Sequence, residues 1–134
     1  MSTYALPSLV TTIALMVYFI VTLNVGRARA KYQIKPPITS GNPDFERVLR
    51  VQQNMVEQLV VFLPALWLFS VYIDPRWGAG IGTLWVLGRI LYAWGYYQAV
   101  EKRWAGFVMS VFSTSLLVFG SLVGVLIVLL HPSP

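Results

Sequence analysis

The sequence contains no cysteine and a single histidine, His131, among its 134 residues. Without cysteine, the chain has no disulfide framework, no thiolate metal site and no cysteine nucleophile. A lone histidine near the C-terminus argues against a metal site or catalytic triad built on histidine, and we expect no bound metal. Charged residues are also scarce, at 11%, against about 25% in an average soluble domain. This is not the composition of a soluble protein.

Hydrophobic residues make up 57% of the chain, and they gather in four runs. A helix that crosses a bilayer needs about 20 such residues. The second run, residues 58–73, is too short by itself, so its helix must begin in the polar stretch before it, which lacks glycine and proline over residues 44–57. Asn42 and Pro43 are typical of a helix start. The sequence therefore predicts one all-α integral membrane domain, a bundle of four transmembrane helices at about residues 4–25, 43–73, 77–101 and 104–130.

The charges predict how this bundle is oriented. Ten lysines and arginines against five acidic residues give a net charge of +5, and Lys102 and Arg103 share the third connection. Arg76 is the only basic residue in the second connection. The region around the first connection holds six basic residues: Arg27, Arg29, Lys31, Lys35, Arg47 and Arg50. By the positive-inside rule both basic connections are cytoplasmic and both termini lie on the opposite side, in a bacterial inner membrane or an endoplasmic reticulum.

Basic residues beside apolar runs do not form the basic, aromatic-interleaved surface of a nucleic-acid binder. We therefore expect membrane lipid, and no nucleic acid, among the partners.

Two helices carry polar faces that can meet. At about 100° per residue, a sector of roughly 80° on the second helix holds Arg47, Arg50, Asn54 and Glu57. On the third helix, a sector of about 60° by the same arithmetic holds Arg89, Tyr92 and Tyr96, and Arg103 continues that face. Because these helices are antiparallel neighbours, the two faces can meet in the cytoplasmic half of the bundle.

Glu57 and Arg89 both lie deep in their helices. A charge near the bilayer centre costs about 2.5–3.5 kcal/mol, so we expect these two to contact each other or to share a ligand. The other charges are read more simply, with Arg47 and Lys102 as ordinary helix-end residues.

The polar set also suggests a ligand. Arginines, a carboxylate, an amide and two phenols suit a small zwitterion with an amino group and more than one carboxylate. An arginine can also stabilise a thiolate. Glutathione has all of these features.

Four segments resemble a known family. Residues 46–57 (ERVLRVQQNMVE) and 62–67 (FLPALW) are similar to the second-helix signature of the MAPEG family, the membrane-associated proteins in eicosanoid and glutathione metabolism. Residues 89–92 (RILY), together with Gly95 and Tyr96, resemble the third-helix signature of its leukotriene-synthase and microsomal glutathione-transferase branch. Residues 36–41 (PPITSG) resemble that branch's first connection. The resemblance runs from about residue 27 to residue 103.

The resemblance implies a homotrimer with glutathione, the co-substrate, at each subunit interface near the cytoplasmic side. Arg103 matches the arginine that stabilises the glutathione thiolate, with Lys102 as the alternative. Arg29 and Gln52 would reach glutathione from the neighbouring subunit, and Gln52 does point away from the Arg50 face by the helical arithmetic. Arg89 would support the site from behind. The residues that would hold glutathione within one subunit are Arg50, Asn54, Glu57, Tyr92 and Tyr96.

The function implied is a membrane-bound glutathione transferase that conjugates glutathione to hydrophobic electrophiles, with glutathione-dependent reduction of lipid hydroperoxides as a related activity. Gln58 and Ala30 depart from the leukotriene-synthase pattern, which favours a broader transferase.

Two alternatives come from other functional classes. A non-catalytic lipid-binding scaffold of the same family would not need Arg50, Glu57 and Arg103. A small multidrug exporter would carry a glutamate in its first helix, and residues 4–24 contain no acid.

Overall fold

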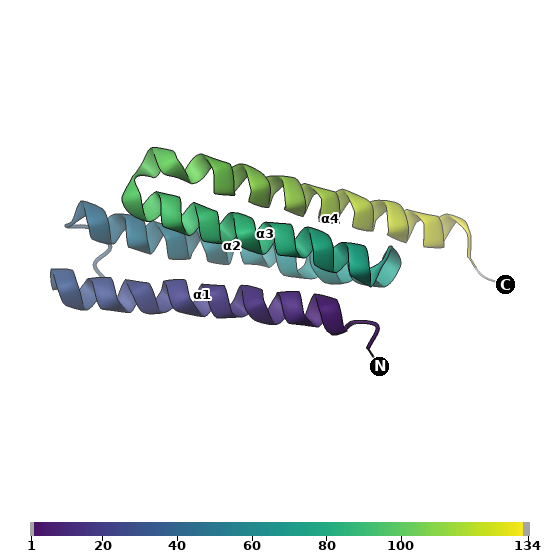
Figure 1. Ribbon diagram of the computed structural model, residues 1–134, viewed down its shortest axis with the longest axis horizontal. Helices are drawn as coiled ribbons and strands as arrows, with labels where there is room; N and C mark the ends of the chain where they lie inside the picture. Colours follow the sequence, from purple (N-terminus) through teal and green to yellow (C-terminus); the bar gives the residue numbers. More distant parts are fainter. Residues whose placement is uncertain (1, 133–134) are drawn as a thin grey trace.

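The computed structural model describes residues 2–132, which form four long α-helices and no strand. The helices are α1 (Ala5–Tyr32), α2 (Pro43–Tyr72), α3 (Pro75–Gln98) and α4 (Trp104–Leu130), with a short 3-10 helix, η1 (Val100–Arg103), before α4. They run side by side along one axis, and each is antiparallel to the next in the chain (Figure 1). The all-α prediction is confirmed.

Capping residues and prolines fix where the two central helices begin. The Asn42 side-chain oxygen accepts hydrogen bonds from the backbone N–H groups of Asp44 and Phe45, at 2.8 and 3.1 Å. At the start of α3, Asp74 accepts in the same way from Arg76 and Trp77. In both cases a proline follows the cap, where its missing N–H is not needed by the helix. The second helix therefore begins in the polar stretch, as the sequence predicts.

The first helix is longer than the sequence predicts. We expected it to end near residue 25, but α1 continues to Tyr32 and ends where Gln33 adopts a left-handed conformation, with φ of 55°. Arg29 and Lys31 occupy its last turn, where positive charge interacts favourably with the helix dipole. Basic residues assigned to the first connection are thus part of the helix. The third helix is shorter than predicted, because its expected last residues form η1.

The central helices α2 and α3 lie between α1 and α4, and each packs against both of them (Figure 1). Phe62 of α2 and Trp85 of α3 stack with ring centroids 3.8 Å apart at the centre of the core. Helices α3 and α4 approach most closely at Gly88 and Gly106, where a Cβ on Gly106 would collide with the Gly88 carbonyl and the Tyr92 backbone.

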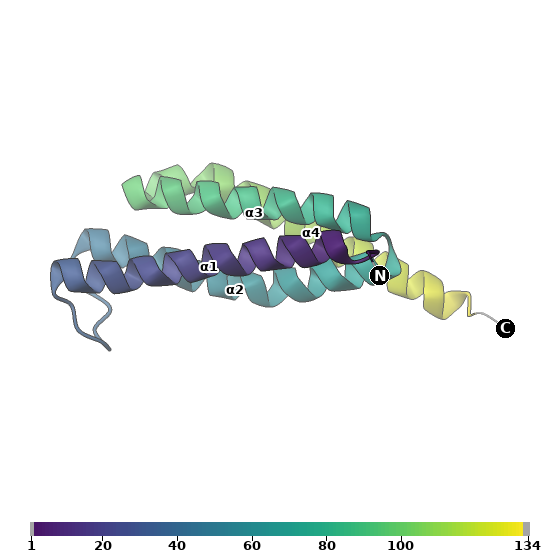
Figure 2. The same ribbon diagram turned by 60° about the horizontal axis from the view of Figure 1, so that its bottom comes forward.

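The connection over residues 33–42 and the η1 segment lie at one end of the bundle, opposite both ends of the described chain (Figure 2). All the residues that form the candidate site are near this end.

Three segments are long and apolar enough to cross a membrane: Ala5–Tyr32, Pro43–Tyr72 and Val100–Leu130. Large apolar side chains such as Phe19, Trp94 and Phe119 are exposed on the outer surface, as expected of helices that face lipid. Helix α3 is not among these segments, although its 24 residues at 1.5 Å each extend about 36 Å. The membrane crossing by α3 therefore stays a prediction. The trimer also stays a prediction.

Candidate functional site

A cavity of about 290 Å³ opens between α2, α3, η1 and α4. Five of the residues around it were selected from the sequence, and three apolar residues of η1 and α4 complete the wall. The lining residues are Arg50, Asn54, Tyr92, Tyr96, Val100, Arg103, Trp104 and Phe107. The two predicted polar faces thus meet at one end of the bundle.

Arg89 lies behind this cavity and holds one of its walls in place. Its Nη2 donates a hydrogen bond of 2.6 Å to the Asn54 side-chain oxygen. Its guanidinium carbon lies 4.2 Å from the centroid of the Tyr92 ring. Arg89 is only 2% exposed, and its other two side-chain nitrogens have no hydrogen-bond partner among the residues that the structure describes. Because the Asn54 oxygen is already occupied, its NH₂ group is the part of that amide left to donate to a ligand.

The predicted direct contact between Arg89 and Glu57 is wrong, whereas the alternative, that the two residues share a ligand, stays a prediction. Glu57 forms an ion pair with Arg50 instead, at 3.1 Å from Nη1 to Oε1, and no ion pair joins Glu57 to Arg89 within residues 2–132. The reason is that Glu57 and Arg50 lie two turns apart on an outer face of α2, where both side chains are about half exposed. Arg89 points into the bundle, where the neutral amide of Asn54 accepts its hydrogen bond.

Two basic residues of the third connection are oriented differently. Arg103 lines the cavity, donates from Nη1 to the Val100 carbonyl at 2.7 Å, and lies over the Trp104 ring at 4.4 Å. Lys102 contacts Gln98 at 3.1 Å and does not line the cavity. Of the two alternatives left by the sequence, Arg103 therefore has the position from which a cavity ligand can be reached.

The two residues assigned to a neighbouring subunit lie away from this cavity. Arg29 donates to the carbonyls of Ile34 and Ile38, at 3.3 and 2.8 Å. Gln52 donates to the Tyr18 hydroxyl of α1 at 3.3 Å. Both side chains are therefore on the α1 side of α2, consistent with the helical arithmetic for Gln52. The structure does not bring them to Arg50 within one chain.

Sequence reasoning did not find the apolar part of the cavity wall. Trp104 and Phe107 belong to α4, which contains no charged residue, so no charged face marks a binding site there as it does on α2 and α3. The pairing of their rings, with centroids 5.8 Å apart in an edge-to-face arrangement, is visible only in three dimensions.

The charges around the cavity favour an anion. Arg50 and Arg103 both line it, and within the described part of the chain the one carboxylate that forms an ion pair with either of them is that of Glu57, which pairs with Arg50. Within residues 2–132 there is no group of three or more histidine, cysteine, aspartate or glutamate side chains that could hold a metal ion. The available chemistry is therefore that of fixed positive charge, an amide and two phenols.

Comparison with known proteins identifies the family. The model of the MAPEG family matches residues 7–123. The chain belongs to the MAPEG family. A relative in Synechocystis, itself called uncharacterized, is 58% identical over 90% of this chain and 88% of its own length.

Two further MAPEG relatives have names that indicate function. Human microsomal glutathione S-transferase 2 is 41% identical, over 77% of this chain and 70% of its own. Leukotriene C4 synthase of Cavia porcellus is 37% identical, over 75% and 67%. The expected branch of the MAPEG family is thereby confirmed, and with its apolar helices the chain is a membrane protein.

Proposed function

We propose that this chain is a membrane-bound glutathione transferase, which binds glutathione in the cavity, ionises its thiol and conjugates it to hydrophobic electrophiles. The observation that carries the proposal is that Arg50, Asn54, Tyr92, Tyr96 and Arg103 surround one cavity. Relatives named glutathione transferase and leukotriene C4 synthase support the same class of chemistry.

Each polar group has a role in binding that follows from its chemistry. Arg50 offers a planar fork of donors that suits a carboxylate of glutathione. Glu57, which already contacts Arg50, suits the amino group of the same molecule. The Asn54 NH₂ donates to a carbonyl or carboxylate oxygen, since Arg89 occupies its own oxygen. The hydroxyls of Tyr92 and Tyr96 add donors on the opposite wall.

Arg103 is the residue assigned to thiol activation. Its guanidinium is always protonated, and a fixed positive charge beside a thiol stabilises the thiolate and lowers the thiol pKa. Arg103 also occupies the N-cap position of α4, where the helix dipole favours a negative charge. The thiol proton leaves to water, the thiolate sulfur attacks the electrophilic carbon, and the leaving group departs with its electron pair. The same thiolate would reduce a lipid hydroperoxide to its alcohol and become the sulfenic acid of glutathione, which a second glutathione converts to glutathione disulfide and water.

The complete site is proposed to need a homotrimer. Arg29 and Gln52 face away from the cavity of their own chain, so they can serve glutathione only from a neighbouring subunit. With both basic connections on the cytoplasmic side, water-soluble glutathione enters from the cytoplasm and the electrophile arrives from the lipid. Against the scaffold alternative, we note that this cavity combines two arginines with an amide and two phenols, more polar groups than an apolar lipid tail would use.

The test is conjugation of glutathione to a chloronitrobenzene by the protein purified in detergent. We expect glutathione-dependent turnover, and a loss of roughly 100-fold in Arg103→Ala, the size of effect seen when one group that stabilises an anion is removed. Arg76→Ala is the matched control, because Arg76 is an exposed arginine at the other end of the bundle. Absence of any glutathione-dependent turnover, or equal loss in both variants, would overturn the proposal.

A further inference from the structure

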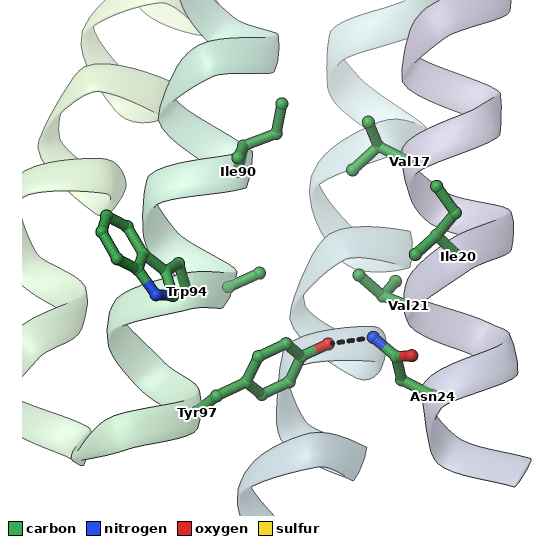
Figure 3. A pocket seen from close by; sticks show the side chains of 8 residues that line it. Val17, Ile20, Val21, Asn24, Ile90, Trp94 and Tyr97 are labelled. Carbon is green, nitrogen blue, oxygen red and sulfur yellow. Dashed lines mark hydrogen bonds between the residues drawn. The ribbon is translucent and has the colours of Figure 1, made fainter. Parts of the chain in front are cut away.

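A second cavity, separate from the candidate glutathione site, lies between α1 and α3. Its volume is about 360 Å³, and Figure 3 shows the aliphatic side chains of α1 facing Ile90 and Trp94 of α3. The lining residues are Val17, Ile20, Val21, Asn24, Ile90, Ala93, Trp94 and Tyr97. None of them lines the cavity that contains Arg103. We call this cavity the α1–α3 groove.

The α1–α3 groove is polar at one end only. There the Asn24 side-chain nitrogen donates a hydrogen bond of 3.2 Å to the Tyr97 hydroxyl, as Figure 3 shows. The remaining lining residues are apolar, and Ile20 and Trp94 are 53% and 65% exposed. The groove is therefore open on its outer side, where a membrane protein meets acyl chains. From Val17 to Asn24 it follows about 10 Å of helix.

A basic pocket continues the groove beyond this polar pair. It has a volume of about 260 Å³ and shares Asn24 and Tyr97 with the groove, so the two are contiguous. Its other lining residues are Arg27, Ala28, Lys31, Tyr32 and Val48. Four of these residues, Arg27, Ala28, Lys31 and Tyr32, belong to α1 and follow Asn24 toward the C-terminal end of that helix, in the direction of the membrane surface.

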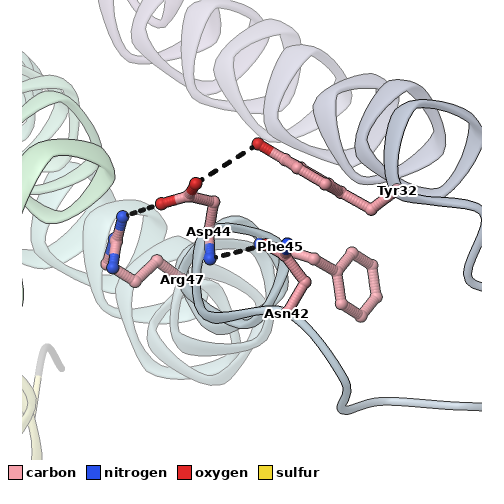
Figure 4. A network of polar contacts seen from close by, with 5 residues as sticks. All are labelled: Tyr32, Asn42, Asp44, Phe45 and Arg47. Atoms are coloured by element: carbon pink, nitrogen blue, oxygen red, sulfur yellow. Dashed lines mark hydrogen bonds and ion pairs between the residues drawn. The ribbon is translucent and has the colours of Figure 1, made fainter.

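The positive charge of the basic pocket is not neutralised by the chain. Arg27 contacts only the Asn24 side-chain oxygen, at 3.5 Å, and neither Arg27 nor Lys31 forms an ion pair within the described residues. Asp44 accepts a hydrogen bond from Tyr32 at 3.4 Å, but its charge is matched by Arg47, as Figure 4 shows. Two unmatched cations thus remain beside the polar end of the groove.

We propose that the α1–α3 groove and the basic pocket together bind one anionic phospholipid of the membrane. An acyl chain lies along the groove, the glycerol ester region meets Asn24 and Tyr97, and the phosphate lies between Arg27 and Lys31. The order of apolar wall, polar pair and cations matches the order of parts in such a lipid. Basic residues at the membrane surface attract anionic headgroups, whereas a zwitterionic headgroup would bring a cation of its own beside Arg27 and Lys31. The inference does not depend on the proposed transferase function.

Trp94 provides the readout, because bromine atoms on an acyl chain quench tryptophan fluorescence by contact. The protein is placed in bilayers of phosphatidylcholine containing a small fraction of brominated phosphatidylglycerol, or the same fraction of brominated phosphatidylcholine. Trp94→Phe identifies the part of the quenching that belongs to the groove. The double variant Arg27→Gln/Lys31→Gln removes the positive charge of the basic pocket. Arg76→Gln is the matched control, because Arg76 lies at the other end of the bundle.

We expect the quenching assigned to Trp94 to favour the anionic lipid by roughly tenfold in relative affinity, as two cations near the membrane surface predict. The preference should disappear in the double variant and in high salt, and persist in Arg76→Gln. Equal quenching by both lipids, or a preference that survives in the double variant, would overturn the proposal. If a brominated free fatty acid displaces the phospholipid and quenches Trp94 in its place, the proposal is also overturned, because the occupant would then be a single-chain carboxylate.

Discussion

In the candidate site, the hydrogen bond between the buried residues Asn54 and Arg89 should contribute more to stability than the ion pair between Arg50 and Glu57. Arg89 is almost fully buried, and within residues 2–132 the 2.6 Å hydrogen bond to Asn54 is the only one its guanidinium makes. The ion pair between Arg50 and Glu57 is about half exposed at both ends. Stability should therefore be more sensitive to the neutral amide of Asn54 than to the carboxylate of Glu57.

We predict that Asn54→Ala lowers the free energy of unfolding by about 1–3 kcal/mol, since it leaves a buried charged donor unpaired. Glu57→Gln should cost less than about 1 kcal/mol, as expected of an exposed ion pair. Thermal unfolding of both variants in the same detergent, without glutathione, measures the difference. An equal or larger loss in Glu57→Gln would contradict this account of the buried pair.

Much of the residue-level site could be predicted from spacing, and the exceptions have a clear cause. The helical period places Arg50 and Asn54 on one face of α2, and Tyr92 and Tyr96 on one face of α3, and these faces do meet. The period gives a direction around a helix but neither the rotamer of a long side chain nor its partner. For that reason it could not show that Glu57 pairs along its own helix.

At the scale of the elements, the packing of α3 on α4 depends on glycines that allow their backbones to approach. We predict that Gly106→Ala destabilises the protein by about 1–3 kcal/mol, the usual cost of overpacking, because its Cβ would meet the Gly88 carbonyl and the Tyr92 backbone. Gly80→Ala on α3 is the control, since a Cβ there has nothing within 4 Å. That variant should be neutral or gain about 0.5–1 kcal/mol of stability.

Thermal unfolding of the two alanine variants distinguishes these outcomes. In Gly106→Ala, the new Cβ should also displace Tyr92 from the cavity wall and so reduce glutathione binding. Equal stability of the two variants would show that the α3–α4 approach is looser than described.

The existence and order of the helices were predictable from hydrophobic runs and capping residues, but the end of α1 was not. Hydrophobicity marks the part of a helix that lies in lipid, and it falls away over residues 26–32, where α1 carries Arg27, Arg29 and Lys31. The stop is set by the left-handed Gln33, whose conformation the sequence does not specify.

At the scale of the whole molecule, the assembly is the main prediction. Arg50 and Arg103 line the cavity, whereas Arg29 and Gln52 lie on the α1 side of the chain. If all four serve one ligand, two chains must contribute to each site, and the resemblance to the MAPEG family implies a homotrimer with three such sites. A mass measurement corrected for bound detergent should give three chains per particle. A stable monomer that retains glutathione conjugation would contradict this arrangement.

The central claim is that a fixed positive charge at Arg103 ionises the glutathione thiol, and the thiolate absorbance of bound glutathione tests it most directly. The measurement is a titration of that absorbance against pH in the wild-type protein and in Arg103→Ala, with glutathione affinity measured in parallel. We predict a thiol pKa well below that of free glutathione in the wild type. In the variant it should return toward the free value, while binding through Arg50, Asn54 and Glu57 persists. An unchanged thiol pKa in Arg103→Ala would remove Arg103 from the mechanism.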